Sequence, residues 1–452
     1  MERPRFHHRR LVVVGSDAND KIALRLQAGR SDVLEVDFGD DGSADFKFHV
    51  EPIAAITVDA GSGDDSFVWD PGDGSDTIEG RDGNDSMVFN GAAASEQVNL
   101  SANGDRLTFF RNPGNITMNS RSVENVDFNA LGGADSVSVH DLTGTGVSAV
   151  NLDLAGTLGG TAGDGQSDRV AVDATNGDDF VNVTGDASGV AISGQAARVA
   201  VLHAEPNDNL DAAGLGGADS ISATGLAAGT ISATLDGGAG DDRIAGGPGI
   251  ETLFGGDGND SIDGNGGNDA ADLGAGDDTF FWDPGDGSDT IEGQDGNDTM
   301  LFNGGAGSDQ VTVSANGDRL TFFRNPGNIT MDTHSVENVD FNALGGADAV
   351  TVNDLTGTGV TNVVVDLAAA LPGSAGDGAA DRVIVNGTNG NDAIAVGGAV
   401  EVHGLAAAVT VRHPEAANDR LEINTLAGVD TVDTSKLRAG LIQLLVNGIS
   451  VP

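Results

Sequence analysis

Apolar residues recur at a fixed interval in the middle of the chain. From residue 237 to residue 312 they are Ile244, Leu253, Ile262, Ala271, Phe280, Ile291, Met300 and Val311. Each is the one inward-pointing side chain expected of a three-residue strand. The glycines between them favour tight turns, because glycine adopts positive φ without strain. The pattern predicts short strands joined by Gly-rich turns.

The interval is nine residues, with two insertions of two residues, and each unit has an acidic residue two places before its apolar residue. The acidic residues are Asp242, Glu251, Asp260, Asp269, Asp278, Asp289, Asp298 and Asp309. One unit makes half a coil, so every second unit stacks on the same edge. We therefore expect two rows, with Glu251, Asp269, Asp289 and Asp309 on one edge and the other four residues on the opposite edge.

Each acidic residue lies beside the backbone carbonyls of a Gly-rich turn, where no Cβ obstructs access. Ca²⁺ prefers hard oxygen ligands such as carboxylates and carbonyls. Stacked turns supply the two halves of each ion site, which gives up to about six sites. A flexible Gly/Asp linker is the alternative, but a linker would not keep the apolar place in step with the acidic one. The spacing favours a calcium-binding coil.

The units resemble the repeats-in-toxin, or haemolysin-type calcium-binding, nonapeptide, whose consensus is GGxGxDx-apolar-x. The resemblance implies a right-handed parallel β-roll that binds calcium between turns through backbone carbonyls and the sixth-place aspartate. Carried onto this chain, the carbonyl ligands include those of Gly237, Ala239, Gly255 and Asp257, and the carboxylate ligands are Asp242, Asp260, Asp269, Asp278, Asp289, Asp298 and Asp309. Glu251 departs from the pattern, and its longer side chain puts that site in doubt.

A weaker copy of the units lies upstream, with Asp65, Asp76, Asp85 and Glu96 at the acidic place. We expect one or two calcium sites there, on the three aspartates, because the unit around Glu96 has lost its glycines. This block begins a long duplication: residues 63–183 recur as residues 276–396, and phrases such as WDPGDGSDTIEG and SVENVDFNALGGAD stand in both copies.

Between the blocks, Gly-rich turns are followed by an aspartate and then by alternating apolar and polar residues, which indicates longer strands. No segment has the apolar spacing of a helix. We predict an all-β fold: a right-handed parallel β-roll or β-solenoid with an internal duplication. Its predicted segments are 1–58 (N-terminal β segment), 59–99 (degenerate calcium-repeat block), 100–236 (long rungs), 237–312 (calcium-binding block) and 313–452 (second copy of the long rungs).

The charge balance excludes several classes of partner. The chain has 70 acidic and 22 basic residues and a formal net charge of −48. Nucleic-acid binding needs clustered Lys and Arg, and an anionic membrane would repel this surface. No segment approaches the ~20 apolar residues of a membrane helix. With no cysteine, bound cations are the available means of relieving self-repulsion and stapling the fold.

The resemblance also implies an extracellular location, since such proteins leave bacteria through a one-step type I exporter. We read no C-terminal export signal near Pro452, and the duplication stops where another calcium block would begin, as expected of a fragment. Extracellular modules bind Ca²⁺ with a Kd of about 10⁻⁴ to 10⁻³ M. At ~1 mM calcium each site then stabilises the fold by about 0.4 to 1.4 kcal/mol. Calcium should therefore fold these blocks after export.

Catalysis needs a convergent cluster, and neither HExxH nor GxSxG is present. His203 and His413 match between the copies, and a turn position is favoured for both. Arg106 and Arg111, with Arg319 and Arg324, are interpreted as exposed strand arginines in preference to a groove for acidic sugars. Trp69 and Trp282 are interpreted as caps of irregular rungs in preference to sugar-stacking residues.

The sequence therefore predicts a secreted calcium-binding β-solenoid that serves as a structural or adhesive stalk and has no catalysis of its own. Two alternatives remain. One is a calcium-folded accessory region of a larger secreted enzyme or toxin. The other is a surface-layer or filament subunit that assembles through its ends. Predicted partners are calcium ions and either a second copy of the chain or a cell-surface or matrix ligand.

Overall fold

The computed structural model describes residues 4–51, 53–70, 72, 74–373 and 375–451. Its strands form two compact units, residues 1–234 and 235–452. No helix occurs among the described residues. The all-β prediction is therefore confirmed. The division into five segments stays a prediction, and residues 1–3 and 452 of its terminal segments lie outside the described residues.

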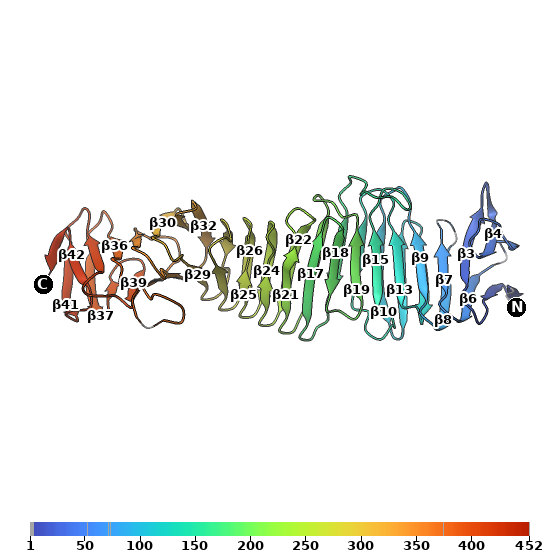
Figure 1. Ribbon diagram of the computed structural model, residues 1–452, viewed down its shortest axis with the longest axis horizontal. Coiled ribbons are helices and arrows are strands. Elements are labelled where there is room, and N and C mark those ends of the chain that lie inside the picture. The colour runs from blue at the N-terminus through green and yellow to red at the C-terminus, as the bar shows by residue number, and fades with distance from the viewer. Residues whose placement is uncertain (1–3, 52, 71, 73, 374, 452) are drawn as a thin grey trace. The chain divides into compact units, whose positions relative to one another are not determined.

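In the second unit, short strands alternate between two sheets, called A and B, so that one strand of each makes a coil (Figure 1). β23 (Arg243–Ala245) pairs in parallel with β25 (Ser261–Asp263), and Arg243 lies opposite Ser261. On the other sheet, β24 (Glu251–Asp257) pairs in parallel with β26 (Ala270–Ala275), and Thr252 lies opposite Ala270. The coil predicted from two nine-residue units is confirmed by this register.

The insertions lengthen the next coil without changing its register. β27 (Thr279–Trp282) pairs with β29 (Thr299–Asn303), and Thr279 lies opposite Thr299. β26 pairs with β28 (Thr290–Glu292) in the same way. The eight predicted inward-pointing residues, Ile244 to Val311, are all at most 3 % exposed. The core of the coil therefore contains the apolar side chains that the pattern predicted, together with second buried residues on the longer strands, such as Leu273, Trp282 and Phe302.

Glycine is required where the turns stack. Gly258 has φ of +137°, and a Cβ there would overlap the carbonyl oxygen of Gly240 in the preceding coil. Gly240 in turn donates its amide to the carbonyl of Asp257 at 2.6 Å. A side chain at this place would hold adjacent coils apart, so glycine sets the spacing of the rows.

One antiparallel hairpin interrupts the parallel order of sheet A. β30 (Gln310–Asn316) pairs with β31 (Arg319–Asn325), which pairs with β32 (Ile329–His334), and β32 then pairs in parallel with β28. Two strands therefore separate β30 from β28. The expectation that Asp309, before β30, directly follows Asp289, before β28, in one row is wrong, because the hairpin lies between them.

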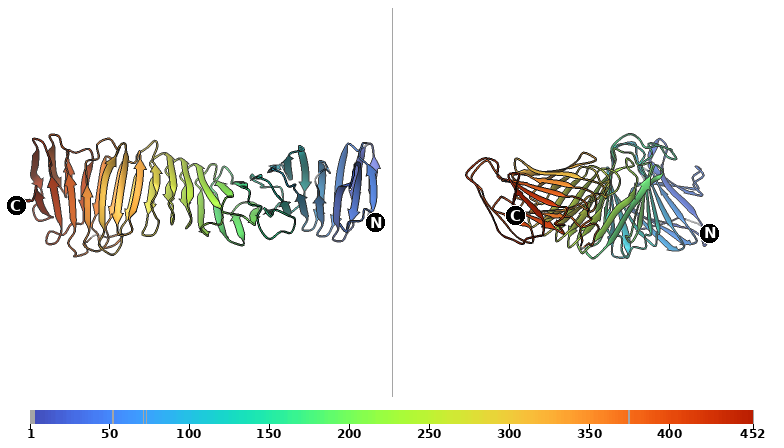
Figure 2. Two further views of the ribbon diagram at one scale, coloured as in Figure 1. Left: turned by 90° about the horizontal axis from the view of Figure 1, so that it is seen from above. Right: turned by 60° about the vertical axis from the view of Figure 1, so that its left-hand side comes forward.

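The remaining strands of the second unit continue both sheets, side by side as Figure 2 shows. In sheet A they are β34 (Ala349–Val352), β36 (Arg382–Asn386), β40 (Arg420–Asn424), β42 (Gln443–Val446) and β43 (Ile449–Val451). In sheet B they are β33 (Asn338–Asn342), β35 (Asn362–Asp366), β37 (Ala393–Gly398), β38 (Glu401–His403), β39 (Ala408–Arg412) and β41 (Thr431–Leu437).

The first unit has the same plan, with β22 (Ser232–Ala239) at the boundary. Its sheet A strands are β1 (Arg5–His7), β2 (Arg10–Val14), β6 (Ala55–Ser62), β8 (Asp76–Asp82), β10 (Gln97–Asn103), β11 (Arg106–Asn112), β12 (Ile116–Arg121), β14 (Ser136–Val139), β16 (Arg169–Asp173) and β20 (Asn209–Ala213). The hairpin β11–β12 is inserted between β10 and β8, as β31–β32 is between β30 and β28. The duplication in sequence is therefore also a duplication in topology.

Sheet B of the first unit also contains hairpin strands. Its strands are β3 (Lys21–Gln27), β4 (Arg30–Phe38), β5 (Phe46–His49), β7 (Ser66–Trp69), β9 (Ser86–Asn90), β13 (Asn125–Asn129), β15 (Ala149–Asp153), β17 (Phe180–Asp186), β18 (Gly189–Ser193), β19 (Arg198–Leu202) and β21 (Ser220–Leu226). The runs β3–β4–β5 and β17–β18–β19 pair antiparallel, whereas neighbouring coils pair in parallel. The parallel solenoid thus contains antiparallel insertions, which the sequence analysis did not predict.

Candidate calcium sites

Sixth-place carboxylates form a continuous row along sheet B. The backbone amide of Asp242 donates to Asp260 Oδ1 at 2.8 Å, and the amide of Asp260 donates to Asp278 Oδ1 at 2.7 Å. The amide of Asp278 then donates to Asp298 Oδ1 at 3.0 Å. One oxygen of each later aspartate thus caps the coil before it. This is the predicted row of every second unit.

A second, shorter row lies along sheet A. The amide of Glu251 donates to Asp269 Oδ1, and the amide of Asp269 donates to Asp289 Oδ1, both at 2.8 Å. Glu251 differs from the aspartates because its Oε2 accepts the amide of Gly247 in its own turn at 2.9 Å. Glu251, which departs from the consensus aspartate, therefore also differs from the aspartates in its local hydrogen bonding.

The second carboxylate oxygen of five aspartates in these rows is buried and has no hydrogen-bond partner among the described residues. These oxygens are Oδ2 of Asp260, Asp269, Asp278, Asp289 and Asp298. A buried anionic oxygen without a partner is strongly destabilising, whereas a bound cation would satisfy it. The five oxygens fall one to each gap between successive coils of the two rows. The donor set therefore fits one hard cation in each gap.

Backbone oxygens converge on the same gaps. A Cβ on Gly255 would overlap the carbonyl oxygen of Leu273 and would lie 2.5 Å from Asp260 Oδ2. Among the described residues, no group of three or more His, Cys, Asp or Glu side chains could hold a metal alone. Any cation here must therefore also use backbone carbonyls, which is how Ca²⁺ completes its six to eight oxygen ligands.

The predicted carbonyl ligands have different surroundings. A Cβ on Gly237 would lie 2.6 Å from the Gly255 carbonyl oxygen, so these two residues line one gap. The carbonyl of Asp257 accepts the amide of Gly240, which leaves it one lone pair for a cation. Ala239 is exposed at the end of β22. Their role as ligands stays a prediction.

Replacing Gly255 by alanine tests the need for space beside the carboxylate. The Cβ would meet the Leu273 carbonyl and Asp260 Oδ2, so we expect Gly255→Ala to destabilise the protein by about 3 kcal/mol and to weaken calcium binding. Gly307→Ala is the matched control, because nothing lies within 4 Å of its added Cβ. Thermal unfolding with saturating calcium measures both variants. Equal melting temperatures would show that the gap is not confined.

Burial leaves these carboxyls hard to ionise in the metal-free protein. It raises the pKa of Asp269 to about 8 and that of Asp289 to about 7. It raises the pKa of Asp260, Asp278 and Asp298 to about 6. The neighbouring carboxylates add to the effect of burial at Asp269, Asp260 and Asp278. A bound cation would oppose both effects and lower the pKa of these carboxyls.

The upstream block retains one row. The amide of Asp20 donates to Asp65 Oδ1 and the amide of Asp65 donates to Asp85 Oδ1, both at 2.8 Å. Oδ2 of Asp65 and Oδ2 of Asp85 are buried without a hydrogen-bond partner among the described residues. The amide of Asp85 then donates to Glu124 Oε2 at 2.8 Å. Two of the three predicted upstream ligands thus have the geometry of the main rows.

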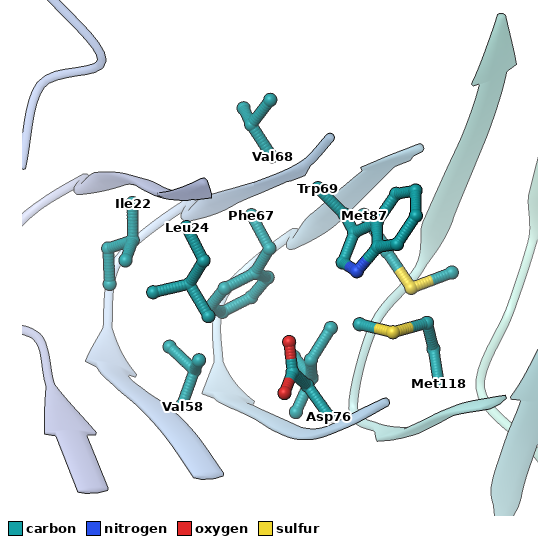
Figure 3. Close-up of a pocket in the computed structure, with 10 residues that line it drawn as sticks. Ile22, Leu24, Val58, Phe67, Val68, Trp69, Asp76, Met87 and Met118 are labelled. Atoms are coloured by element: carbon teal, nitrogen blue, oxygen red, sulfur yellow. The ribbon is translucent and has the colours of Figure 1, made fainter. Parts of the chain in front are cut away.

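Asp76 is placed differently. Its neighbour in the preceding coil of sheet A is Ile56, and no described residue bonds to either of its carboxylate oxygens. Figure 3 shows its carboxyl among Val58, Phe67 and Met118, beside a cavity of about 10 Å³. Burial raises its pKa to about 7. Asp76 therefore lies in no row of carboxylates, and its role as a calcium ligand stays a prediction.

The carboxylates at the two hairpins bind arginine. Arg324 Nη2 lies 2.8 Å from Asp309 Oδ1, and Arg111 Nε lies 2.6 Å from Glu96 Oε1. Both arginines are less than 10 % exposed, so the expectation of exposed strand arginines is wrong for this pair. Arg106 and Arg319 bind Glu79 and Glu292 and are partly exposed. All four arginines that could have formed a groove for acidic sugars are therefore paired with carboxylates of the chain itself.

The tryptophans and histidines have structural partners. Trp282 stacks on Phe302 with 3.8 Å between ring centroids, and its indole N–H donates to the Gly287 carbonyl at 2.9 Å. Trp69 is also buried, so neither ring is available for sugar stacking. His203 and His413 each bind an aspartate at 2.6 Å, Asp153 and Asp366 respectively. The matched histidines thus orient the ends of matched strands.

Rows of the same kind continue outside the nonapeptides, which the sequence reasoning missed. The amide of Asp135 donates to Asp168 Oδ1 at 2.7 Å, and that of Asp348 donates to Asp381 Oδ1 at 2.8 Å. Burial raises the pKa of both Asp135 and Asp348 to about 8. The sequence signal is the Gly-Gly-Ala-Asp turn that ends at Asp135 and at Asp348, which the sequence analysis interprets only as a turn before a strand.

A parallel roll with a row of partly satisfied, buried carboxylates on each sheet defines a calcium-binding β-roll. Comparison with protein families agrees: residues 72–91, 234–250, 246–280 and 285–311 match the RTX calcium-binding nonapeptide repeat. The chain thus carries four copies of this calcium-binding repeat, whose role in its family is structural. No curated protein matches the chain. The described residues contain no helix that is long and apolar enough to cross a membrane.

Proposed function

We propose that this protein is a secreted structural stalk whose rolls fold on calcium outside the cell, and that it acts by this folding and not by catalysis. The observation that carries the proposal is the set of five buried carboxylate oxygens, one in each gap between coils of the rows, that have no hydrogen-bond partner among the described residues. Their cations would bridge successive coils along both rows. A bridge of this kind stiffens a stack in the direction of its axis.

The ligands we propose are the carboxylates of Asp242, Asp260, Asp269, Asp278, Asp289 and Asp298, with the carbonyls of Gly237, Ala239, Gly255 and Asp257. In the first unit we propose Asp65 and Asp85. The chemistry supplied by calcium is charge compensation, because the chain has a net charge of −48. Asp260, Asp269, Asp278, Asp289 and Asp298 each give one oxygen to an amide of the preceding coil and would give the other to the ion.

Force spectroscopy on the whole chain, held by its two ends, tests the role as a stalk. With millimolar calcium we expect a distinct unfolding event for the nonapeptide block, and with a chelator we expect that block to extend without resistance. Identical force–extension curves in the two conditions would overturn the proposal. Light scattering in the same buffers separates the filament alternative, which requires a large rise in mass when calcium is added.

A further inference from the structure

Arg324 lies beside Asp309, a sixth-place carboxylate of the nonapeptide block that pairs with a cation of the chain's own. It stands on β31, directly opposite Val311 of β30. Its Nη2 is 2.8 Å from Asp309 Oδ1, with side-chain exposures of 9 % and 0 % respectively. The other oxygen, Asp309 Oδ2, accepts the amide of Gly305 at 2.9 Å. The guanidinium therefore compensates a carboxylate that is shut off from solvent.

The oxygens around Asp309 are otherwise those of a calcium gap. A Cβ on Gly304 would lie 2.7 Å from Asp309 Oδ2, 2.8 Å from the Ala343 carbonyl oxygen and 2.9 Å from the Asn342 carbonyl oxygen. The amide of Asp309 donates to Asp348 Oδ1 at 2.7 Å, as in the rows. This turn differs from that of Asp260 in two ways: the guanidinium lies against Asp309 Oδ1, and Asp309 Oδ2 accepts the amide of Gly305.

Trp282 at the end of β27 holds the guanidinium in place from a second side. Arg324 Cζ lies 5.5 Å from the centroid of the Trp282 ring, within the range of a cation–π interaction. Trp282 is itself fixed by its bond to Gly287 and by its stacking on Phe302. The positive charge is thus set between an aromatic face and a buried carboxylate.

The first unit repeats this arrangement with a different acid. Arg111 Nε lies 2.6 Å from Glu96 Oε1, and Arg111 Cζ lies 5.8 Å from the Trp69 ring. A Cβ on Gly91 would lie 2.9 Å from the carbonyl oxygens of Asn129 and Ala130. The same four features therefore occur at both hairpins of sheet A: a buried arginine, its acidic partner, a tryptophan ring and two backbone carbonyls.

We propose that Arg324 is a built-in cation that occupies a latent calcium site at Asp309 and ends the series of bound ions there, and that Arg111 does the same at Glu96. This inference rests on the proposed calcium function of the rows. Because the arginine arrives with the hairpin, the interrupted coil would remain charge-compensated when calcium is scarce.

The test is the number of calcium ions bound by the full chain, counted by native mass spectrometry and by calorimetry. Arg324→Gln removes the charge and should bind one ion more than the wild type. Arg324→Lys keeps a cation and should bind the same number as the wild type. Arg111→Gln asks the same question in the other copy, and the double variant should bind two more.

Each outcome decides one point. An Arg324→Gln protein that binds no additional ion, or that stays unfolded at every calcium concentration, overturns the latent site. A wild type that binds no calcium refutes the proposed function itself, whatever the variants do. We also expect the melting temperature of Arg324→Gln to rise more steeply with calcium than that of the wild type.

Discussion

Removing calcium will unfold the nonapeptide block of the second unit while its long rungs keep their strands. In that block five buried carboxylate oxygens have no hydrogen-bond partner among the described residues, so each gap of the metal-free roll holds either an uncompensated carboxylate or an unsatisfied carboxyl. About five sites of Kd 10⁻⁴ to 10⁻³ M supply about 2 to 7 kcal/mol at ~1 mM calcium. This is comparable with the stability of a whole domain, about 5 to 15 kcal/mol.

Hydrogen exchange followed by mass spectrometry measures this effect segment by segment. With a chelator we expect peptides from residues 237–303 to lose most of their protection, and peptides from residues 338–424 to keep theirs. The long rungs serve as the internal control, because most of their strands bury two or more apolar side chains, whereas β23, β24, β25 and β28 of the block bury one each. Equal protection with and without calcium would mean that the apolar core alone holds the block.

Raising the pH from about 5 to about 8 will destabilise the metal-free protein and strengthen its binding of calcium. The row carboxyls have folded pKa values of about 6 to 8, well above the value of 3.8 in the unfolded chain. The folded state therefore binds more protons than the unfolded state in this range, and the free energy of unfolding falls as the pH rises. Each unit of pKa shift corresponds to about 1.4 kcal/mol, so the total loss is several kcal/mol.

Calcium reverses this dependence, because it competes with protons for the same oxygens. Denaturant unfolding with a chelator should give a free energy that declines from pH 5 to pH 8. Calorimetry in buffers of different ionisation enthalpy should show protons released on binding near pH 6.5. Asp269→Asn, which cannot titrate, should flatten the decline. A metal-free stability that rises over this range would contradict the assigned burial of the carboxyls.

The repeating geometry could be predicted because it is local. The nine-residue period fixes which residues point inward, and two units per coil place Asp242, Asp260, Asp278 and Asp298 in register. The bond from each amide to the next carboxylate then follows from the turn itself. These predictions needed only the stacking of identical units.

The residues that depart from the row pattern could not be predicted, because their surroundings depend on which coil packs against theirs. Asp76 and Asp289 stand in the same sequence, WDPGDGSDTIEG, but the preceding coil offers Ile56 to one and Asp269 to the other. The hairpin that separates Asp309 from Asp289 did leave a signal. Asn316-Gly317, between two runs of alternating residues, is a strong hairpin turn. The partner of Arg324 follows only once that hairpin is in place.

The most direct measurement is the calcium count of Asp278→Asn beside that of Asp277→Asn, by native mass spectrometry near pH 7.5. Both variants remove one negative charge from the same turn, but Asp278 is buried in the row and Asp277 is exposed. Asparagine at residue 278 can still cap the amide of Asp260. The account predicts that Asp278→Asn loses at least one ion and that Asp277→Asn loses none. Equal counts in the two variants would contradict the assignment of the rows as calcium ligands.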